Sequence, residues 1–310
     1  MAGEFDLVVA GSGIAGLSAA LTGARLGLKT LCLTGDVLGG QLLSINHIDG
    51  YPGFPDGVAG YDLCPMTQEQ AVAAGAEIAA TSLDGIEAQD GRWRLATGDG
   101  DLAARGIVLA TGAALKELGV PGEDRFKGKG VSHCASCDAP LLRGKDAVVI
   151  GGGDSACQEA LTLAEAAARV TLLHRGADLS AQPAYRDAVR QQPNIEIRFN
   201  HVAVEILGEN GVTAVRVRDT KGGATAEIAA AGVFVYIGLA PHTAFLHDAI
   251  RLSATGRIPT DAALRTALTG IAAAGAVRQG WAGRAVAAAG EGTAAAIAIA
   301  DYLRHDRWRD

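Results

Sequence analysis

Residues 5–16 read Phe-Asp-Leu-Val-Val-Ala-Gly-Ser-Gly-Ile-Ala-Gly, an apolar run followed at once by spaced glycines. The apolar run predicts a buried strand, residues 17–26 have a helical pattern, and a second strand is expected at 30–33. A strand, a Gly-x-Gly-x-x-Gly turn and a helix in this order are typical of a dinucleotide-binding unit. Its glycines let the backbone close on a pyrophosphate at the start of the helix. They are Gly11, Gly13 and Gly16.

The same order of elements returns near the middle of the chain. Residues 147–150 predict a strand, 151–156 (Gly-Gly-Gly-Asp-Ser-Ala) a second turn, 157–167 a helix and 170–173 the next strand. One such motif is a weak signal, but two at domain-sized separation favour two nucleotide-binding units. Two glycine-rich turns that merely pack tightly remain the alternative.

Each unit is followed by a further strand that ends in small residues. These strands are expected at 108–113 and 232–238, and residues 271–300 predict a strand, a glycine turn and a helix that returns to the first unit. The predicted fold class is therefore α/β, with two Rossmann-like, three-layer domains, the second inserted into the first. The predicted domains are residues 1–113 plus 243–310, and residues 114–242.

Composition excludes several classes of protein. The chain has 310 residues with 27 Lys+Arg and 34 Asp+Glu, hence a formal net charge of −7, and 49% of it is hydrophobic. This balance excludes disorder and gives no basic footprint for nucleic acid or an anionic membrane. Residues 271–300 never reach about 18 uncharged apolar residues in a row, so we expect no membrane span. We read no signal peptide and expect a cytoplasmic protein.

Two of the five cysteines form a Cys-x-x-Cys pair, Cys134-Ala-Ser-Cys137. Such a pair can bind zinc, form a structural disulfide or cycle between thiol and disulfide. No second pair supplies the remaining zinc ligands, so no metal site is predicted, and a cytosolic disulfide this short gains little stability. The pattern therefore favours redox cycling. The remaining cysteines are expected to be small buried residues; they are Cys32, Cys64 and Cys157.

His133 directly precedes the pair. It could act as a base that deprotonates a thiol. A solvated or core histidine is an equally good interpretation, because neighbours on an extended segment point to opposite faces.

The order of motifs resembles that of the low-molecular-weight thioredoxin reductases over nearly the whole chain. The matching stretches are GSGIAG (11–16), GGQL (39–42), IDGYPGFP (48–55), ATGA (110–113), CASCD (134–138), GGGDSA (151–156), HR (174–175), IGLAP (237–241) and AAGAV (273–277). The resemblance implies that the first domain binds FAD and that the inserted domain binds a nicotinamide nucleotide and carries the dithiol. It also implies a homodimer whose partner is a thioredoxin-like protein or a small disulfide or dithiol.

The resemblance also implies site residues. Cys137 would be the sulfur on the flavin side, Cys134 would attack the substrate disulfide, and Asp138 would give or take a proton, although Asp138 could instead cap the following helix. The implied FAD contacts are Gly11, Ser12, Gly13, Ala15, Gly16, Thr34, Gly40, Gln41, Ala110, Thr111, Gly112, Gly275, Ala276, Arg284 and Ala285. The implied NAD(P) contacts are Gly151, Gly153, Asp154, Ser155, His174, Arg175, Ile237 and Gly238.

The chain departs from the family pattern at both nucleotide sites. Ala276 stands where the family has an aspartate that binds FAD, and Gly176 and Ser180 stand where it has arginines that hold the NADPH 2′-phosphate. Each missing charged contact is worth about 1.5–3 kcal/mol, so NADPH and NADH both stay open as donors. Trp308 is interpreted as a dimer or surface contact rather than as cover for the flavin.

The predicted function is that of an FAD-dependent disulfide reductase using Cys134 and Cys137. One alternative is a dithiol oxidase that passes electrons from a small dithiol to FAD and oxygen. A ferredoxin-type donor in place of NADPH, and a non-enzymatic redox-responsive binding module, are further alternatives.

Overall fold

The computed structural model describes residues 3–35 and 37–308 and divides into two compact units. Unit 1 comprises Met1–Ala114 and Pro241–Asp310, and unit 2 comprises Leu115–Ala240. These limits differ by one or two residues from the expected domain limits. Both units are α/β, as predicted.

Unit 1 is built on a seven-stranded sheet in the order β3-β2-β1-β6-β5-β4, with β17 also paired to β6. Its first four strands and β17 run parallel, whereas β5 is antiparallel to β6 and to β4. The strands are β1 (Glu4–Ala10), β2 (Thr30–Leu33), β3 (Glu77–Ala79), β4 (Leu83–Gln89), β5 (Arg92–Thr97), β6 (Leu102–Leu109) and β17 (Ile271–Ala273). The helices are α1 (Ile14–Arg25), α2 (Gly60–Ala73) and α6 (Ala285–His305), with 3₁₀ turns at Gly40–Ser44, Ala244–Leu246 and Gly275–Val277.

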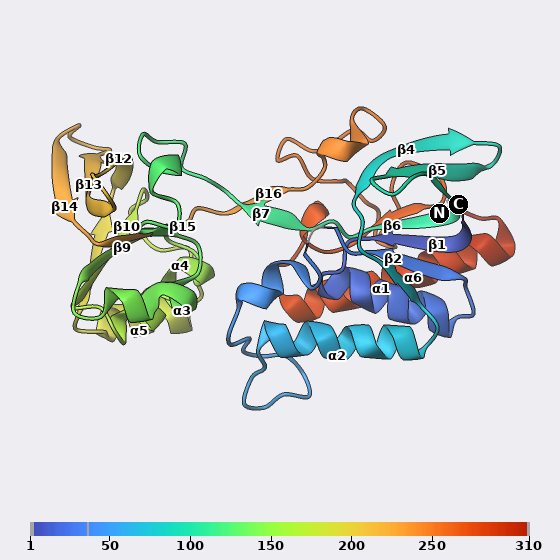
Figure 1. The fold of residues 1–310 in the computed structure, drawn as a ribbon, viewed down its shortest axis with the longest axis horizontal. Coiled ribbons are helices and arrows are strands. Elements are labelled where there is room, and N and C mark those ends of the chain that lie inside the picture. The colour runs from blue at the N-terminus through green and yellow to red at the C-terminus, as the bar shows by residue number, and fades with distance from the viewer. Residues whose placement is uncertain (1–2, 36, 309–310) are drawn as a thin grey trace. The chain divides into compact units, whose positions relative to one another are not determined.

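Unit 1 has a core on each face of its sheet. Helices α1, α2 and α6 cover one face, and the β4–β5 hairpin curls over the other (Figure 1). Strand β1 is buried on both faces, as parallel central strands are, so it reads as a continuous apolar run. Helices α1 and α6 pack closely at Gly292, where a Cβ would lie 1.9 Å from the carbonyl oxygen of Ala15.

By length and composition alone, helix α6 could cross a membrane. The sequence nevertheless predicts no membrane span here, because Glu291 interrupts the apolar stretch. In the structure, α6 packs on α1 and buries Ala295, Ala296 and Ile299 in the core of unit 1. Of its most apolar stretch, 28% is buried in this way, so α6 packs on unit 1 with one face.

The interpretation of Trp308 as a surface or dimer contact is wrong. Its side chain is only 6% exposed, packs edge-to-face on Tyr302 and donates a hydrogen bond to the carbonyl of Thr266. Trp308 thus fixes the C-terminal end of α6 to the rest of unit 1. So large an aromatic side chain can be buried there because its N–H group also finds an acceptor.

Unit 2 has a parallel five-stranded sheet in the order β11-β10-β9-β15-β8. Helices cover one face and an antiparallel sheet, β12-β13-β14, covers the other, with a core on each side (Figure 1). The strands are β8 (Val131–Ser132), β9 (Asp146–Gly151), β10 (Arg169–His174), β11 (Ile195–Phe199), β12 (His201–Gly208), β13 (Val212–Asp219), β14 (Thr225–Ala229) and β15 (Gly232–Tyr236). The helices are α3 (Ala135–Asp138), α4 (Asp154–Ala164) and α5 (Pro183–Gln191), with 3₁₀ turns at Asp124–Phe126 and Ala139–Leu142.

Helices α1 and α4 both begin three residues earlier than the sequence pattern predicts. Each starts directly after the glycine at its N-cap, Gly13 in α1 and Gly153 in α4. The apolar periodicity marks only the buried face, whereas the helix itself starts where the turn ends.

The two segments in which the chain passes between the units, β7 (Ala113–Leu115) and β16 (Leu239–Pro241), pair with each other as a two-stranded sheet. Beyond β7, the buried carboxylate of Glu123 accepts hydrogen bonds from the backbone N–H groups of Leu118 and Gly119 (2.8 and 2.7 Å). A carboxylate that binds two backbone donors holds the start of unit 2 in a single conformation.

Candidate functional site

Cys134 and Cys137 are joined in a disulfide on the surface of unit 2. Cys137 is exposed, whereas Cys134 is half-buried at the start of α3. The sulfur of Cys134 accepts a hydrogen bond from the backbone N–H of Cys137 (3.3 Å) and lies 3.5 Å from the Ser136 hydroxyl. Donors aimed at a sulfur stabilise its thiolate, so Cys134 is the better placed of the two to react as a nucleophile once reduced.

The segment around this disulfide, residues 132–138, is hereafter the redox loop. Ala135 and Ala139 are buried against α4, because small residues let the two helices approach closely. The Ser132 hydroxyl accepts from the N–H of Cys134 (3.1 Å) at the start of the loop. The buried alanines and the serine together hold the disulfide in place.

His133 lies half-buried, with Nδ1 2.9 Å from the carbonyl oxygen of Val235 on β15. Because a carbonyl only accepts, Nδ1 is the donor in this hydrogen bond. The ring is therefore fixed against the sheet by its backbone contact.

Asp138 ends α3, and its N–H donates to the carbonyl of Cys134 (3.2 Å). Its side chain makes no capping hydrogen bond to the following 3₁₀ turn in the described structure, so the alternative reading of Asp138 as a cap is not supported. Its negative charge instead acts on the buried Tyr236, whose pKa it helps to raise.

The first glycine turn, in unit 1, needs glycine at two positions. Gly11 has φ +109°, and a Cβ there would lie 2.3 Å from the carbonyl oxygen of Ala110. A Cβ on Gly16 would lie 1.7 Å from the carbonyl oxygen of Gly11. A Cβ on Gly13 would meet no described atom within 4 Å, so the turn opens there. This cradle fits a pyrophosphate that approaches the start of α1.

Several other predicted FAD residues lie in the loop after β2, beside this turn. The buried Ser12 hydroxyl donates to the carbonyl of Thr34 and accepts from the N–H of Gly39 (3.2 Å each), so it joins the turn to the loop after β2. Gly40 packs against Gly13, and Gln41 beside it is exposed. Both hydrogen bonds of the Ser12 hydroxyl are therefore made with backbone groups, and they hold the loop after β2 against the glycine turn.

Thr111 and Gly112 follow β6 and form hydrogen bonds to His242, which lies directly after β16. The Thr111 hydroxyl donates to the carbonyl of His242 (2.7 Å), and the N–H of His242 donates to Gly112. Ala15 lies instead in the packing between α1 and α6. Arg284 and Ala285 start α6, where Arg284 is exposed.

The second glycine turn, in unit 2, repeats the backbone of the first. A Cβ on Gly151 would lie 2.3 Å from the carbonyl oxygen of Tyr236, whereas on Gly153 the nearest described atom is the Ser180 hydroxyl at 3.9 Å. The Asp154 carboxylate accepts from Gln182 N and Nε2 (2.7 and 2.9 Å), which anchors the loop after β10. Of the remaining predicted residues here, Ser155, Ile237 and Gly238 are all exposed.

Comparisons with a family model, curated proteins and solved structures point to one family. A family model described as pyridine nucleotide-disulphide oxidoreductase matches residues 5–292. The chain belongs to this family. It is 41% identical over 300 residues to a thioredoxin reductase of Treponema pallidum, with 97% of each chain covered. Thioredoxin reductase structures from Lactococcus lactis and T. acidophilum are 35% and 33% identical, with TM-scores of 0.93 and 0.92; each match covers 97% of this chain and 99% of the other.

The protein is therefore a flavin-dependent disulfide oxidoreductase of the thioredoxin reductase type. The expectation of a thioredoxin reductase-like enzyme is confirmed, and the reading as a non-enzymatic module loses its support. Among the described residues, the glycine cradle of unit 1 has the shape that fits the pyrophosphate of FAD. Polar side chains at this site are scarcer than the family pattern would give.

Around Ala276, where the family pattern has an aspartate, two other side chains bind the backbone. The Ala276 carbonyl accepts from Arg257 (3.2 Å), and the N–H of Gly275 donates to Glu291 (2.8 Å). Glu291 also forms a largely buried ion pair with Arg278 (2.5 Å). Sequence reasoning missed this ion pair, although an arginine just after the glycine turn and an acidic residue inside an apolar helix were visible signals.

The loop after β10 lacks a phosphate clamp. The His174 ring packs on Gly152 and edge-to-face on Phe199, so it supports the turn. Arg175 is exposed, and the exposed Asp178 carboxylate pairs with Arg190 (2.8 Å) and Arg186 (3.4 Å) of α5. Of the three arginines around this loop, Arg186 and Arg190 are thus already paired with Asp178, whereas the second glycine turn itself fits the pyrophosphate of a dinucleotide.

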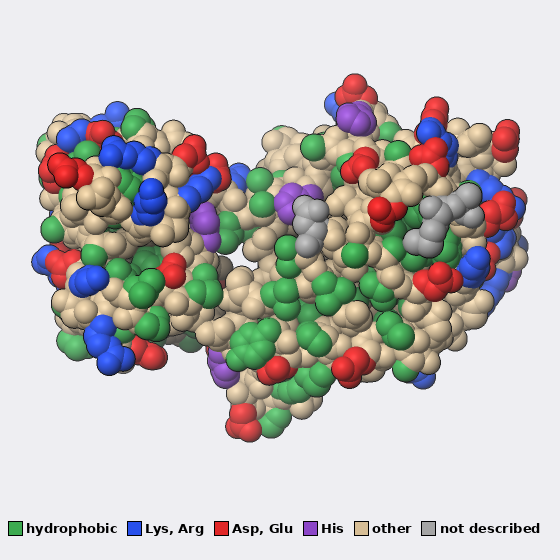
Figure 2. Space-filling view, viewed as in Figure 1, with side chains coloured by type: hydrophobic (Ala, Val, Ile, Leu, Met, Phe, Trp, Pro, Cys, Tyr) green, Lys and Arg blue, Asp and Glu red, His purple; other side chains and the backbone are tan. Residues whose placement is uncertain are grey.

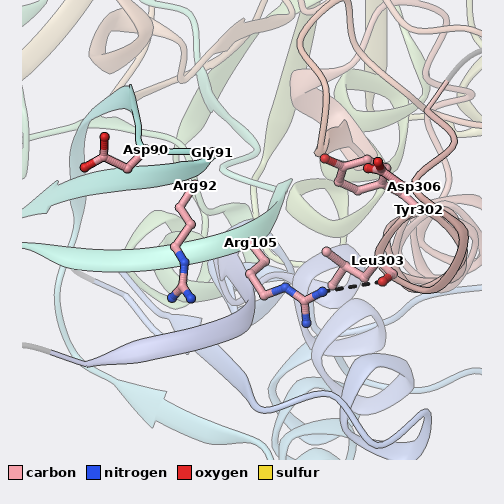
Figure 3. A pocket seen from close by; sticks show the side chains of 7 residues that line it. All are labelled: Asp90, Gly91, Arg92, Arg105, Tyr302, Leu303 and Asp306. Carbon is pink, nitrogen blue, oxygen red and sulfur yellow. Dashed lines mark hydrogen bonds between the residues drawn. The ribbon is translucent and has the colours of Figure 1, made fainter.

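A shallow cavity of about 230 Å³ in unit 1 lies between the β4–β5 turn and the end of α6 (Figure 3). Its two arginines, Arg92 and Arg105, are paired with Glu4 and Asp6 (2.8 and 2.9 Å). None of the predicted site residues lines it. With its cations neutralised, this cavity has no chemistry that the redox reaction could use.

Proposed function

We propose that the protein reduces the disulfide of a thioredoxin-like protein or of a small molecule through Cys134 and Cys137. The observation that carries the proposal is a disulfide on the surface of unit 2 in which the Cys134 sulfur has backbone and hydroxyl donors directed at it. FAD, when bound, supplies the two electrons that open this disulfide.

The remaining steps belong to the cysteines. The thiolate of Cys134 attacks one sulfur of the substrate disulfide, forms a mixed disulfide and releases the other substrate sulfur as a thiolate. Cys137 then attacks Cys134, which re-forms the Cys134–Cys137 bond and releases the second substrate thiolate. Asp138, at the end of the redox loop, is the group that gives protons to the departing sulfurs.

The surface beside the redox loop supports a macromolecular substrate. Leu141, four residues after Cys137, is 69% exposed. An apolar residue next to a reactive sulfur gives a partner protein something to pack on while the mixed disulfide lasts.

A trapping experiment tests these roles. The Cys137→Ser variant should accumulate a mixed disulfide with thioredoxin through Cys134, because the resolving thiol is gone, and the Cys134→Ser variant should not. The adducts are counted by non-reducing mass spectrometry. Trapping by the Cys134→Ser variant alone would reverse the assignment, and no adduct with either variant would reject a thioredoxin-like substrate.

The electron donor is a separate part of the proposal. The loop after β10, where Asp178 pairs with Arg186 and Arg190 and where Gly176 and Ser180 replace the arginines of the family pattern, supports NADH or a donor other than a nicotinamide over NADPH. The same observation favours the dithiol oxidase as a second candidate, in which a dithiol reduces the cysteine pair and oxygen finally takes the electrons. Peroxide formed from dithiols in air without any nicotinamide would identify the oxidase; its absence would reject it.

A homodimer is proposed from the surface of unit 1. Hydrophobic side chains gather over the α2 side of this unit (Figure 2). They include Tyr61 and Val72 of α2, which are 50% and 51% exposed, and a neighbouring copy could bury them. The mass from light scattering should be that of two chains and should fall to one chain in Tyr61→Asp; a monomeric parent would reject the proposal.

A cytoplasmic location is proposed from the cysteines. Three of them, Cys32, Cys64 and Cys157, are buried and free, as predicted, and a reducing compartment keeps such thiols free. Fractionation of the native cells tests the location, and recovery outside the cytoplasm would reject it.

A further inference from the structure

Behind the redox loop, α3 packs on α4, and the side chain of Glu159 reaches from α4 to the loop. The half-buried carboxylate of Glu159 accepts a hydrogen bond from the backbone N–H of Ala135 (3.2 Å), which lies between the two cysteines. The sequence patterns did not single out Glu159. Its contact nevertheless fixes the short segment that must keep its shape while the disulfide opens and closes.

Tyr236, at the end of β15, lies beside this carboxylate. The residue is 8% exposed, and its hydroxyl is enclosed and makes no hydrogen bond of good geometry to any residue that the structure describes. Burial raises the pKa of the Tyr236 hydroxyl, and the nearby charges of Glu159 and Asp138 raise it further. The hydroxyl interacts with the Glu159 carboxyl and with the backbone of Ala135, so it joins β15 to the carboxyl that holds the redox loop.

The ionisation of Glu159 is set by the same surroundings. Burial raises the pKa of its carboxyl, while the Ala135 N–H and the nearby Tyr236 hydroxyl oppose that rise without cancelling it. Within residues 3–35 and 37–308, the ionisable groups that act on the Glu159–Tyr236 pair are Asp138 on α3 and the pair itself, whereas Asp154 and Arg190 act on Cys157. Glu159 therefore gains and loses its proton at a higher pH than an ordinary glutamate.

We propose that Glu159 is a positioning residue of the dithiol, which anchors the redox loop through the N–H of Ala135 and whose negative charge opposes formation of the Cys134 thiolate. This inference rests on the proposed redox role of the pair. Opening the disulfide breaks the S–S bond with two electrons from FAD, places one proton on the Cys137 sulfur and leaves Cys134 as a thiolate.

The test measures thiol reactivity in the full-length flavoprotein. The protein is reduced with dithiothreitol, freed of reductant and treated with iodoacetamide over a range of pH, and labelling of Cys134 is followed by peptide mass spectrometry. The buried Cys157, whose pKa burial raises to about 11, serves as an internal reference for unfolding. In the parent, the rate should show two inflections, one for the thiol and one for Glu159.

Three variants separate positioning from a merely structural role. Glu159→Gln keeps an oxygen that can accept from Ala135 but has no charge, so it should lose one inflection and label Cys134 about tenfold faster where Glu159 is ionised in the parent. Tyr236→Phe should move that inflection to higher pH, because it removes a group that favours the ionised carboxyl. Glu165→Gln removes the same charge from the exposed C-cap of α4 and should leave the profile unchanged.

Profiles of the parent and Glu159→Gln that superimpose would overturn the inference, as would an equal shift in Glu165→Gln. A parent in which dithiothreitol never makes Cys134 reactive would instead reject the proposed redox function.

Discussion

The two glycine turns have nearly the same sequence pattern and the same backbone, but their surroundings differ. In unit 1, the third glycine position is Gly16, which has no room for a Cβ, and in unit 2 it is Ala156, which is buried without difficulty. In unit 1, the buried Ser12 binds the glycine turn to the loop after β2. In unit 2, the exposed Ser180 and the half-buried Asp154 bind the glycine turn to the loop after β10. A shared motif therefore fixes a phosphate-binding backbone, while neighbouring loops decide how tightly it is held and what else it binds.

The largest expected effect comes from exchanging the third position. Gly16→Ala should lower the free energy of unfolding by about 3 kcal/mol and abolish stoichiometric FAD binding, because the added Cβ overlaps the Gly11 carbonyl oxygen and forces the turn open. Ala156→Gly is the matched control and should cost only about 0.5–1 kcal/mol. Urea unfolding and the ratio of flavin to protein absorbance measure both. A Gly16→Ala protein that keeps its flavin would break the comparison.

The loop after β10 offers the next largest effect. Gly176→Arg should tighten NADPH binding by about tenfold to a hundredfold and leave NADH binding within a factor of about two, because the new guanidinium meets only the 2′-phosphate. Asp178→Asn should act in the same direction more weakly, since it removes an opposing carboxylate. Calorimetric titration with each nucleotide measures the selectivity. Equal tightening for NADH would show that the loop does not face the 2′ position.

The smallest effect distinguishes the two serines. Ser12→Ala should cost about 1–3 kcal/mol of stability, because the carbonyl of Thr34 loses its hydroxyl donor in a buried place, whereas the N–H of Gly39 keeps its bond to the Ser12 carbonyl. Ser180→Ala should cost less than about 1 kcal/mol, since the backbone N–H of Ser180 still binds the carbonyl of Gly152 (2.8 Å). Thermal unfolding of the two variants gives the order, and a larger loss in Ser180→Ala would contradict it.

The sequence predicted the parallel strands and both turns because their signals are local. Apolar runs bounded by glycine locate β1, β2, β9 and β10 to within a residue or two. The antiparallel layers, β4–β5 and β12–β14, escaped because their half-exposed strands carry many polar residues and depend on pairing partners for their shape.

The same limit applies to the site. Cys134 and Cys137 were evident from their spacing, since a Cys-x-x-Cys pair needs nothing but neighbouring residues. Glu159 and Tyr236 were not, because they reach the redox loop from α4 and β15 and only the packing of these elements brings them together. Asp178 was missed for a related reason, because its pairing with α5 shows only in three dimensions.

The central claim is that electrons pass between FAD and the Cys134–Cys137 disulfide. An anaerobic reductive titration of the purified flavoprotein tests it most directly, with the visible absorbance of the flavin as the readout. The account predicts that the parent takes up two electron pairs per chain, one in FAD and one in the disulfide, and that Cys134→Ser takes up one. Uptake of a single pair by the parent, with the disulfide still closed when the flavin is fully reduced, would contradict it.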